Sequence, residues 1–296
     1  MSKKNTVANE AIETIEMNAV LRKPVLRVLV TSGSDTRQTK TSTATHGIKP
    51  FLENYYDEVD LWGVELEAHA RGVESRLYLP SDIEMLAKDL TYARPTVPGG
   101  RRALIVDLGG DLFRDLMSEM EAIDGGGLKF DVVIYPITTT ADVRKFETML
   151  LSLIDAGIEL STVHVVFNLI KKDDAKSGFQ GITKKFQALG NIAALGRKMG
   201  VNVSEAFIQE NGLQSQLTQL EMEADESGSL QLKYPELSSM HRLANSEIDY
   251  EALANKALDE DDTETFDRMS KMAYWKKTAI IASKQYALAM QKVFEG

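Results

Sequence analysis

Short apolar runs alternate with helical stretches over roughly 200 residues of this chain, and this alternation is the strongest constraint on its fold. The runs are rich in branched side chains, and polar loops follow them. They span residues 25–30, 59–66, 103–107, 130–137, 163–168 and 202–208. Near-continuous apolar runs are typical of parallel strands buried on both faces. We therefore predict an α/β fold, with a mostly parallel sheet and helices on both faces.

Helical patterns are expected before, between and after these strands. They cover residues 7–21, 40–56, 83–90, 111–123, 140–156 and 181–199. Pro50 is expected to kink the second of them, because proline has no N–H to donate. Thr140 is a candidate N-cap, and Gly157 a candidate stop signal, for the helix that they bound.

From Pro235 the pattern becomes wholly helical, with a break near residues 257–262. Methionine and aromatic side chains recur through residues 266–294. They suit either packing against the flank of the sheet or a surface for a second copy or another partner. We divide the chain into an N-terminal arm with a short helix (1–24), an α/β domain (25–234) and C-terminal helices packed on that domain (235–296).

Charge and composition restrict the partners and chemistry that we expect. The net charge of −10 repels phosphate backbones, so we expect no autonomous sequence-specific DNA binding. The chain contains no cysteine, which excludes disulfides, cysteine-zinc sites and thiol nucleophiles. The N-terminal residues lack the apolar stretch of a signal peptide, and no run reaches the roughly 18 apolar residues of a membrane span. We expect a cytoplasmic protein.

The loop after the first strand has the residues of a phosphate-binding site. A phosphate loop joins a strand to a helix N-terminus, with a lysine for the phosphates and a hydroxyl for Mg²⁺. Lys40 and Thr41 occupy these two positions, and Ser42 extends the run of hydroxyls. A Ser/Thr-rich connection without any ligand is the alternative interpretation.

Two features of this loop depart from the usual phosphate-loop pattern. Thr39 stands where a glycine normally precedes the lysine, and the spacing from Gly33 to Lys40 is one residue longer than usual. Close approach of a backbone to phosphate tolerates little Cβ, so both departures affect the loop's chemistry.

Acidic residues end two further strands. The third strand ends in Asp107, the position of a Mg²⁺-supporting aspartate, and Gly110 completes a D-x-x-G pattern with it. An aspartate that merely caps the next turn is the alternative. Glu65 and Glu67 lie on one face at the end of the second strand, where a carboxylate can position water. His69 extends them to a metal-like spacing, but we expect no metal there because further ligands are lacking.

The fifth strand ends in Asn168. A side-chain amide both donates and accepts, so it can pair with the edge of a nucleobase. An asparagine that caps a loop is the alternative.

Together these segments resemble the ParA/MinD-like group of deviant Walker P-loop NTPases. The similar segments are VLVTSG with TKTSTA, GVELEA, LIVDLGG, FDVVIYPITTTADV and VVFN, within residues 25–210. Within that group, the plasmid stability and mobilisation proteins called StbB or MobD are the most similar. The resemblance implies ATP and Mg²⁺ as cofactors, a homodimer with nucleotides between its subunits, and slow ATP hydrolysis.

The resemblance also implies roles for individual residues. Lys40 would hold phosphates, Thr41 would ligate Mg²⁺ with support from Asp107, and Asn168 would recognise adenine. Glu65 would complete the catalytic set, and Gly33, Thr39, Ser42 and Gly110 would line the nucleotide. The group's second lysine is missing because Ser34 follows Gly33, and Arg37 is the candidate substitute for its charge.

Three functions follow as hypotheses. The first is a ParA-like ATPase in plasmid partition, stability or mobilisation, acting with a DNA-binding accessory protein or another protein partner. The second is a catalytically inactive pseudo-ATPase scaffold that binds a protein partner. The third is a small-molecule ligase or kinase of the same superfamily. Whether the chain is an enzyme depends on the altered loop.

Overall fold

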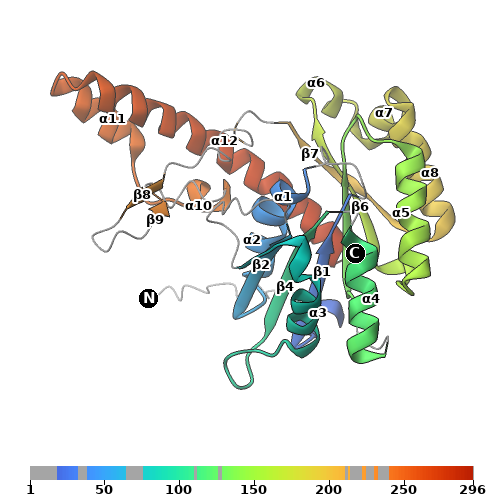
Figure 1. Cartoon of the computed structure of the whole chain (residues 1–296). Coiled ribbons are helices and arrows are strands. Elements are labelled where there is room, and N and C mark those ends of the chain that lie inside the picture. The colour runs from blue at the N-terminus through green and yellow to red at the C-terminus, as the bar shows by residue number, and fades with distance from the viewer. Residues whose placement is uncertain are drawn as a thin grey trace, which may run out of the picture.

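A seven-stranded sheet with every pair of neighbouring strands parallel forms the centre of the computed structural model (Figure 1). The structure describes residues 19–32, 39–64, 76–109, 112–125, 129–210, 213, 222–224, 230–232 and 240–295. The strands of the sheet are β1 (Val25–Val30), β2 (Glu58–Val64), β3 (Arg76–Tyr78), β4 (Arg102–Leu108), β5 (Val132–Ile137), β6 (Val163–Ile170) and β7 (Asn202–Gln209). The predicted α/β fold class is confirmed, and all six predicted strands are present.

The strand order places β1 at the centre of the sheet. The order is β3-β2-β4-β1-β5-β6-β7, so β1 pairs with β4 on one side and with β5 on the other. The chain builds one half of the sheet around β2 and β4 and then crosses to the other side of β1. In sheets of this kind ligands bind beyond the carboxyl ends of the strands, where the order reverses.

Helices cover both faces of the sheet. One face is covered by α3 (Ile83–Tyr92), α4 (Phe113–Asp124), α5 (Val143–Asp155), α7 (Gly178–Lys185) and α8 (Gln187–Met199). The other is covered by α1 (Lys40–Thr43), a π-helical turn (Ala44–Ile48), α2 (Lys49–Leu52), α10 (Met240–Ala244), α11 (Tyr250–Asp259) and α12 (Thr263–Phe294). Side chains of β1 alternate between these layers, since Leu26 and Val28 face the second set and Leu29 faces the first.

Smaller elements complete the described chain. They are α6 (Lys172–Ala175), the 3₁₀ helices Ala19–Arg22, Pro80–Asp82 and Leu160–Thr162, and the antiparallel pair β8 (Met222–Ala224) and β9 (Leu230–Leu232). The expected helix over residues 7–21 lies outside the described residues except for its last turn, which is the 3₁₀ helix Ala19–Arg22.

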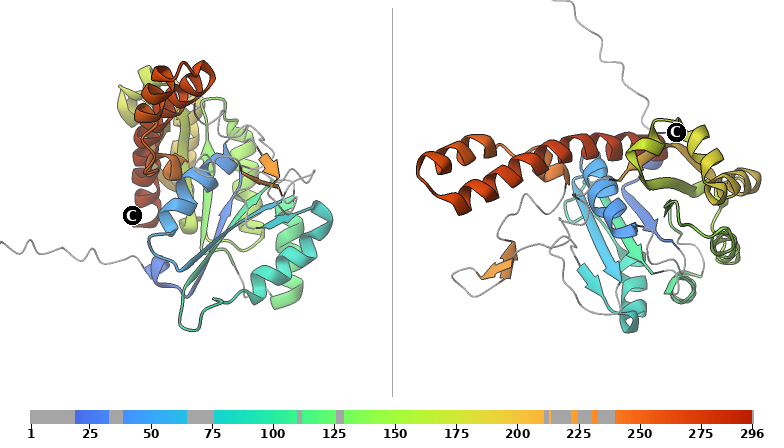
Figure 2. Two further views of the ribbon diagram at one scale, coloured as in Figure 1. Left: turned by 90° about the vertical axis from the view of Figure 1, so that its left-hand side faces the viewer. Right: turned by 90° about the horizontal axis from the view of Figure 1, so that it is seen from above.

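The helix α12 joins the sheet to an arm that extends beyond it. Seen from above, its C-terminal half lies along one side of the sheet, and its N-terminal half continues past the sheet beside α11 (Figure 2). We call α11 together with residues 263–278 of α12 the arm. In the sheet-packed half, Tyr286, Met290 and Phe294 are buried. Among the residues that the structure describes, no helix combines the length and hydropathy that a membrane crossing requires.

Helix 40–52, made of α1, the π turn and α2, lies between the sheet and α12. A Cβ at Gly47 would lie 2.8 Å from Cδ1 of Tyr286, so the glycine permits this close approach. Beside it, burial lowers the pKa of His46 to about 4. The ring is therefore neutral at pH 7, and its Nδ1 accepts the backbone N–H of Met240 at 3.4 Å. These contacts connect helix 40–52 to α10 and α12.

Four local predictions differ from the structure. The helix predicted over residues 40–56 ends at Leu52, and it passes through Pro50 after the widened π turn. Asp142, not Thr140, caps α5, because its carboxylate accepts the N–H of Arg144 at 2.8 Å.

The helix predicted over residues 181–199 is two helices that meet at Phe186, where the backbone is extended. The edge strand β3 was not predicted. Gly157 stops α5 as expected, with a φ of 71°.

Replacing Gly47 with alanine tests the contact between helix 40–52 and α12. The added Cβ overpacks against the Tyr286 ring, and we expect the free energy of unfolding to fall by about 1–3 kcal/mol. Chemical denaturation measures this change. Gly109→Ala is the control, because an added Cβ there meets nothing within 4 Å. An unchanged or raised stability of Gly47→Ala would mean that the two helices are not held this closely.

Candidate functional site

The carboxyl ends of β1 and β4 bring together the residues that the sequence singled out. These strands pair in level register, with Val30 opposite Asp107. The hydroxyl of Thr41, in the first turn of helix 40–52, donates a hydrogen bond to the Asp107 carboxylate. The ammonium of Lys40 donates to the carbonyl of Leu108 at 3.2 Å. Lysine, hydroxyl and carboxylate thus meet at one edge of the sheet, although Asp107 is 66 residues from Thr41 in sequence.

Thr39 adopts a conformation that suits glycine. Its φ of 60° and ψ of 31° are left-handed, a region in which a β-branched side chain is strained. The carbonyl of Thr39 accepts the N–H of Thr43 at 2.9 Å, which is the first bond of the helical ladder. The N–H groups of residues 40–42 lie ahead of that bond, at the end of the helix where anions bind.

Asn168 is fully buried and holds helix 40–52 against β6. Its Nδ2 donates to the hydroxyl of Thr43 at 3.0 Å, and its Oδ1 accepts the N–H of Leu169 at 2.7 Å. Leu169 is left-handed, with a φ of 54°. In this arrangement the amide of Asn168 contacts protein groups, so recognition of adenine would require the bond to Thr43 to open. That role stays a prediction.

Two residues of the site were not singled out from the sequence. The hydroxyl of Tyr135, in β5, donates to the backbone carbonyl of Ser32 at 3.0 Å and fixes the start of the loop. Leu108 contributes a backbone carbonyl, which any residue type could provide. Tyr135 lies within an apolar strand. Its phenolic hydroxyl was the only sequence feature that could have indicated its role.

Several predicted site residues cannot be placed. Gly33, Arg37, Glu65 and Gly110 lie outside the residues that the structure describes, as do Glu67 and His69. Ser42 is half-buried in the first turn of helix 40–52. Elsewhere in the described chain, no group of three histidine, aspartate or glutamate side chains is arranged to hold a metal ion.

The residues present fit a Mg²⁺-bound phosphate group. Mg²⁺ prefers hard oxygen ligands, often a few protein oxygens together with phosphate oxygens. The Thr41 hydroxyl and the Asp107 carboxylate are such oxygens, and they already contact one another. Lys40 adds a positive charge beside them. The observed donor set is therefore appropriate for the ion and the phosphates together.

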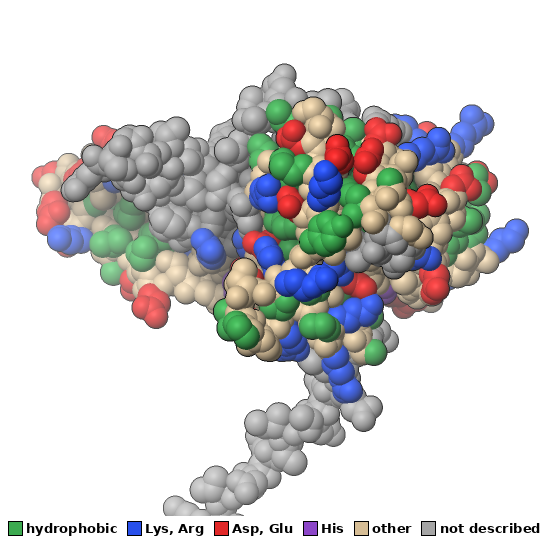
Figure 3. All heavy atoms as spheres, turned by 60° about the horizontal axis from the view of Figure 1, so that its bottom comes forward, with side chains coloured by type: hydrophobic (Ala, Val, Ile, Leu, Met, Phe, Trp, Pro, Cys, Tyr) green, Lys and Arg blue, Asp and Glu red, His purple; other side chains and the backbone are tan. Residues whose placement is uncertain are grey.

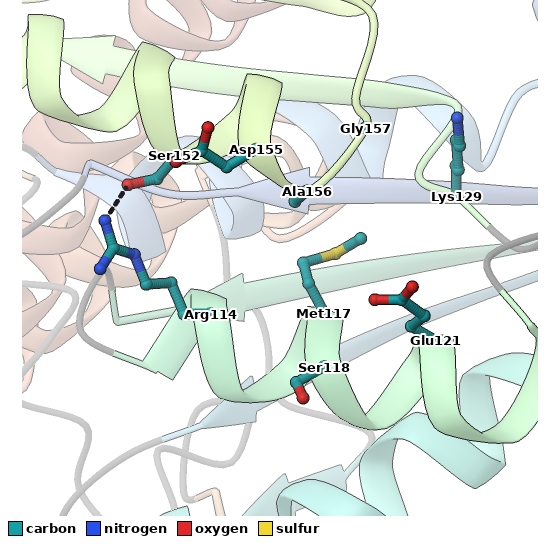
Figure 4. A pocket seen from close by; sticks show the side chains of 9 residues that line it. All are labelled: Arg114, Met117, Ser118, Glu121, Lys129, Ser152, Asp155, Ala156 and Gly157. Atoms are coloured by element: carbon teal, nitrogen blue, oxygen red, sulfur yellow. Dashed lines mark hydrogen bonds between the residues drawn. The ribbon is translucent and has the colours of Figure 1, made fainter.

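Two hollows of the described surface lie away from this edge. One, of about 370 Å³, lies between α4 and α5, where Arg114 donates to the Ser152 hydroxyl at 3.3 Å and Lys129 and Glu121 line the other end (Figure 4). Another, of about 490 Å³, lies near the amino ends of β5 to β7. Neither is lined by the lysine, hydroxyl and carboxylate described above.

The opposite face, at the amino ends of the strands, has mixed charge. Lys and Arg side chains there are interspersed with Asp and Glu in the part that the structure describes (Figure 3). Lys23 pairs with Asp131 at 2.5 Å, and Arg102 with Asp60 at 2.6 Å. Two of the cations of this face are therefore paired with neighbouring carboxylates.

Solved structures with a similar arrangement include three that share little sequence with this chain. A nucleotide-binding protein in complex with ADP from Archaeoglobus fulgidus is 13% identical, covers 66% of this chain and 86% of its own, and has a TM-score of 0.41. The MinC:MinD cell division complex of Aquifex aeolicus is 13% identical over 65% and 85%, with a TM-score of 0.43. Apo McdA from Cyanthece is 15% identical over 66% and 89%, with a TM-score of 0.38.

No protein-family model and no curated protein matches the sequence. MinD, whose group the sequence motifs resemble, is among the similar structures. At these identities and TM-scores the likeness is distant, and the function of this chain rests on its own residues.

Replacing Thr39 with glycine tests the strain in the loop. Glycine adopts the left-handed region freely. We therefore expect the free energy of unfolding of the variant to equal that of the natural chain or to exceed it by up to about 1 kcal/mol. Thermal and denaturant unfolding measure it. Ser42→Gly is the matched control, because glycine in a right-handed helical turn should lower stability by about 1 kcal/mol. Equal losses in both variants would show that Thr39 is not strained.

Replacing Asn168 with alanine separates a structural role from nucleotide recognition. The variant leaves the buried Thr43 hydroxyl without its donor, and we expect a loss of about 1–3 kcal/mol in the free energy of unfolding. Asn202→Ala, which removes a hydrogen bond from an exposed asparagine to the Ser161 carbonyl, is the control and should lose less. A stable Asn168→Ala protein that fails only in nucleotide binding would contradict the structural assignment.

Proposed function

We propose that the chain binds a nucleoside triphosphate with Mg²⁺ at the edge formed by helix 40–52 and the end of β4. The observation that supports this most directly is the contact between the Thr41 hydroxyl and the Asp107 carboxylate, beside the Lys40 ammonium. These three groups converge at the strand ends where the sheet order reverses, which is the position of ligand sites in open α/β sheets.

The bond that Lys40 makes in this structure is readily exchanged for phosphate. Its acceptor is a neutral carbonyl, at 3.2 Å. Phosphate oxygens carry negative charge and form shorter bonds to an ammonium, of about twice the strength of neutral ones. The backbone N–H groups at the start of helix 40–52 would add donors to the same oxygens. Lys40 is therefore positioned to exchange a weak partner for a strong one.

Thr41 and Asp107 would hold the metal ion. Bound Mg²⁺ neutralises charge on the phosphates and so favours their transfer to water. The Asp107 side chain is only 8% exposed, so water screens its charge weakly. Glu65 and Arg37 are the proposed catalytic carboxylate and additional cation, and slow hydrolysis is the activity expected of a loop that lacks the usual glycine before the lysine.

We propose ATP as the nucleotide and a ParA-like role in plasmid partition, stability or mobilisation. The motifs that resemble this group support the proposal, together with the convergence of Lys40, Thr41 and Asp107. A nucleotide-dependent homodimer, acting with a DNA-binding accessory protein or another partner, is part of it. The net charge of −10 supports an accessory protein as the source of any specific DNA contact.

Calorimetry of ATP binding with Mg²⁺ is the decisive experiment. Lys40→Ala should weaken binding by at least about tenfold, because it removes the charge that phosphate would contact. Lys49→Ala, in the same helix but farther along, is the matched control and should bind as the natural chain does. Asp107→Asn should reduce the dependence of affinity on Mg²⁺. A folded natural chain without ATP affinity would overturn the proposal.

Hydrolysis is a separate measurement. If the natural chain releases phosphate from ATP and the Lys40→Ala variant does not, the turnover takes place at this site. Binding without any turnover, in the presence of Mg²⁺, would assign the chain to nucleotide-dependent scaffolds and not to ATPases.

A further inference from the structure

A cavity of about 490 Å³ lies near the amino ends of β5, β6 and β7, on the side of the sheet that α12 covers. Its walls come from the start of β5, residues 161–164, residues 202–205 and the last turn of α12. Ligand sites in proteins are typically hollows of about 300–1,000 Å³ with apolar walls and a few polar groups. The cavity has this size, and it lies one strand length, roughly 20 Å, from the edge that holds Lys40 and Asp107.

Apolar side chains form one part of the cavity wall. Val293 and Phe294 are buried there, whereas Val20 and Val203 are half-buried and keep part of their surface open. The Phe294 ring stacks on Phe51 of α2, with ring centres 5.4 Å apart and an angle of 15° between the rings. That stacking holds the ring in place, so this wall is formed without a ligand. An apolar body in the cavity would cover the open parts of the two valines.

The imidazole of His164 is a polar group of the same wall. Burial lowers its pKa to about 4, so the ring is neutral at pH 7 and carries one donor and one acceptor nitrogen. Among the residues that the structure describes, none forms a hydrogen bond with either ring nitrogen. Polar groups removed from water normally have such partners. A ligand hydroxyl, which both donates and accepts, would suit this ring.

The charges of the lining leave one cation unmatched. Asp131 pairs with Lys23 at 2.5 Å, and Glu205 pairs with Arg197 at 3.2 Å, so each carboxylate of the lining has a cation. Lys292, in the last turn of α12, forms no ion pair or hydrogen bond with any residue in the described part of the chain. Because His164 is neutral, the unmatched charge of the cavity is the ammonium of Lys292. The cavity therefore suits an anion.

Two polar side chains of the lining add acceptors. The amide nitrogen of Asn202 donates to the Ser161 carbonyl at 2.6 Å, and the Thr162 hydroxyl donates to the Glu159 carbonyl at 2.7 Å. These bonds use donors, and they leave the amide oxygen of Asn202 and the hydroxyl oxygen of Thr162 able to accept. Donors on a ligand thus have acceptors in the cavity beside the ring of His164.

We propose that this cavity binds a small carboxylic acid that carries an apolar, preferably aromatic, body and a hydroxyl group. The carboxylate contacts Lys292, the body covers Val20 and Val203, and the hydroxyl pairs with His164. A phosphate group carries about two negative charges, and one of them would have no partner beside a single lysine. The site lies at the edge of the sheet opposite Lys40, so it goes beyond the proposed function and does not depend on it.

The test compound is 4-hydroxyphenylacetate, titrated into the full chain and followed by ligand-observed NMR. We expect a dissociation constant of about 1 mM or lower, which a ligand of this size can reach in a fitting pocket. The neutral amide, 4-hydroxyphenylacetamide, should bind at least about tenfold more weakly, because it lacks the charge that contacts Lys292. Phenylacetate, which lacks the hydroxyl, should bind about threefold more weakly. Lys40→Ala should bind all three as the natural chain does.

Two variants assign the contacts. Lys292→Met should weaken binding of 4-hydroxyphenylacetate at least about tenfold and abolish its advantage over the amide. Lys284→Met is the matched control, because Lys284 is an exposed lysine of the same helix outside the cavity, and it should bind as the natural chain does. His164→Phe keeps an aromatic ring and should abolish the advantage of the hydroxylated acid over phenylacetate. Lys292 is exposed, so its variant should unfold at the same temperature as the natural chain.

A natural chain that binds none of these compounds would overturn the proposal. Equal affinities of Lys292→Met and the natural chain for the acid would overturn it too, as would equal binding of acid and amide. Tighter binding of phenyl phosphate than of phenylacetate would contradict the assignment to carboxylates. Loss of the acid in Lys40→Ala would place it at the nucleotide edge and not in this cavity. Failure of ATP binding alone leaves these expectations unchanged.

Discussion

The register in which β1 pairs with β4 is the constraint on which the rest of the site depends. Val30 and Asp107 are opposite one another, so the loop that leaves β1 and the carboxylate that ends β4 emerge at the same height. A slip of one residue would turn Asp107 to the other face of the sheet. The bond between Thr41 and Asp107 and the approach of Lys40 to Leu108 both require this register. Apolar side chains buried on both faces of both strands enforce it.

Helix 40–52 is held on three sides, and these contacts fix the position of its first turn relative to the sheet. Asn168 fixes it to β6 through Thr43, Gly47 allows Tyr286 of α12 to approach, and His46 accepts a bond from α10. The fixed framework tolerates an unfavourable backbone at Thr39, because strain at one residue persists where surrounding contacts determine the structure. The residues that we propose to bind phosphate and the contacts with the C-terminal helices thus belong to the same helix.

Much of the fold follows from the sequence, because buried parallel strands have a distinctive apolar pattern. The edge strand β3 escaped prediction because it is short, and only Tyr78 of its three residues is buried. Thr140 and Asp142 are both capping residue types two positions apart, and local pattern does not decide between them. The proximity of Lys40, Thr41 and Asp107 was predictable, because Lys40 and Thr41 begin the helix after β1 and Asp107 lies near the carboxyl end of the parallel strand β4. The bond between Asn168 and Thr43 was not, since it joins residues 125 positions apart whose proximity only the folded sheet creates.

The length of α12 has a mechanical consequence. One uninterrupted helix of 32 residues is anchored beside helix 40–52 at one end and reaches the far end of the arm at the other. Its projecting part, residues 263–278, is about 24 Å long at 1.5 Å per residue, so a rotation of about 5° where it leaves the sheet would displace its far end by roughly 2 Å. The arm would therefore act as a lever, because an adjustment too small to disturb the core would be enlarged at its far end.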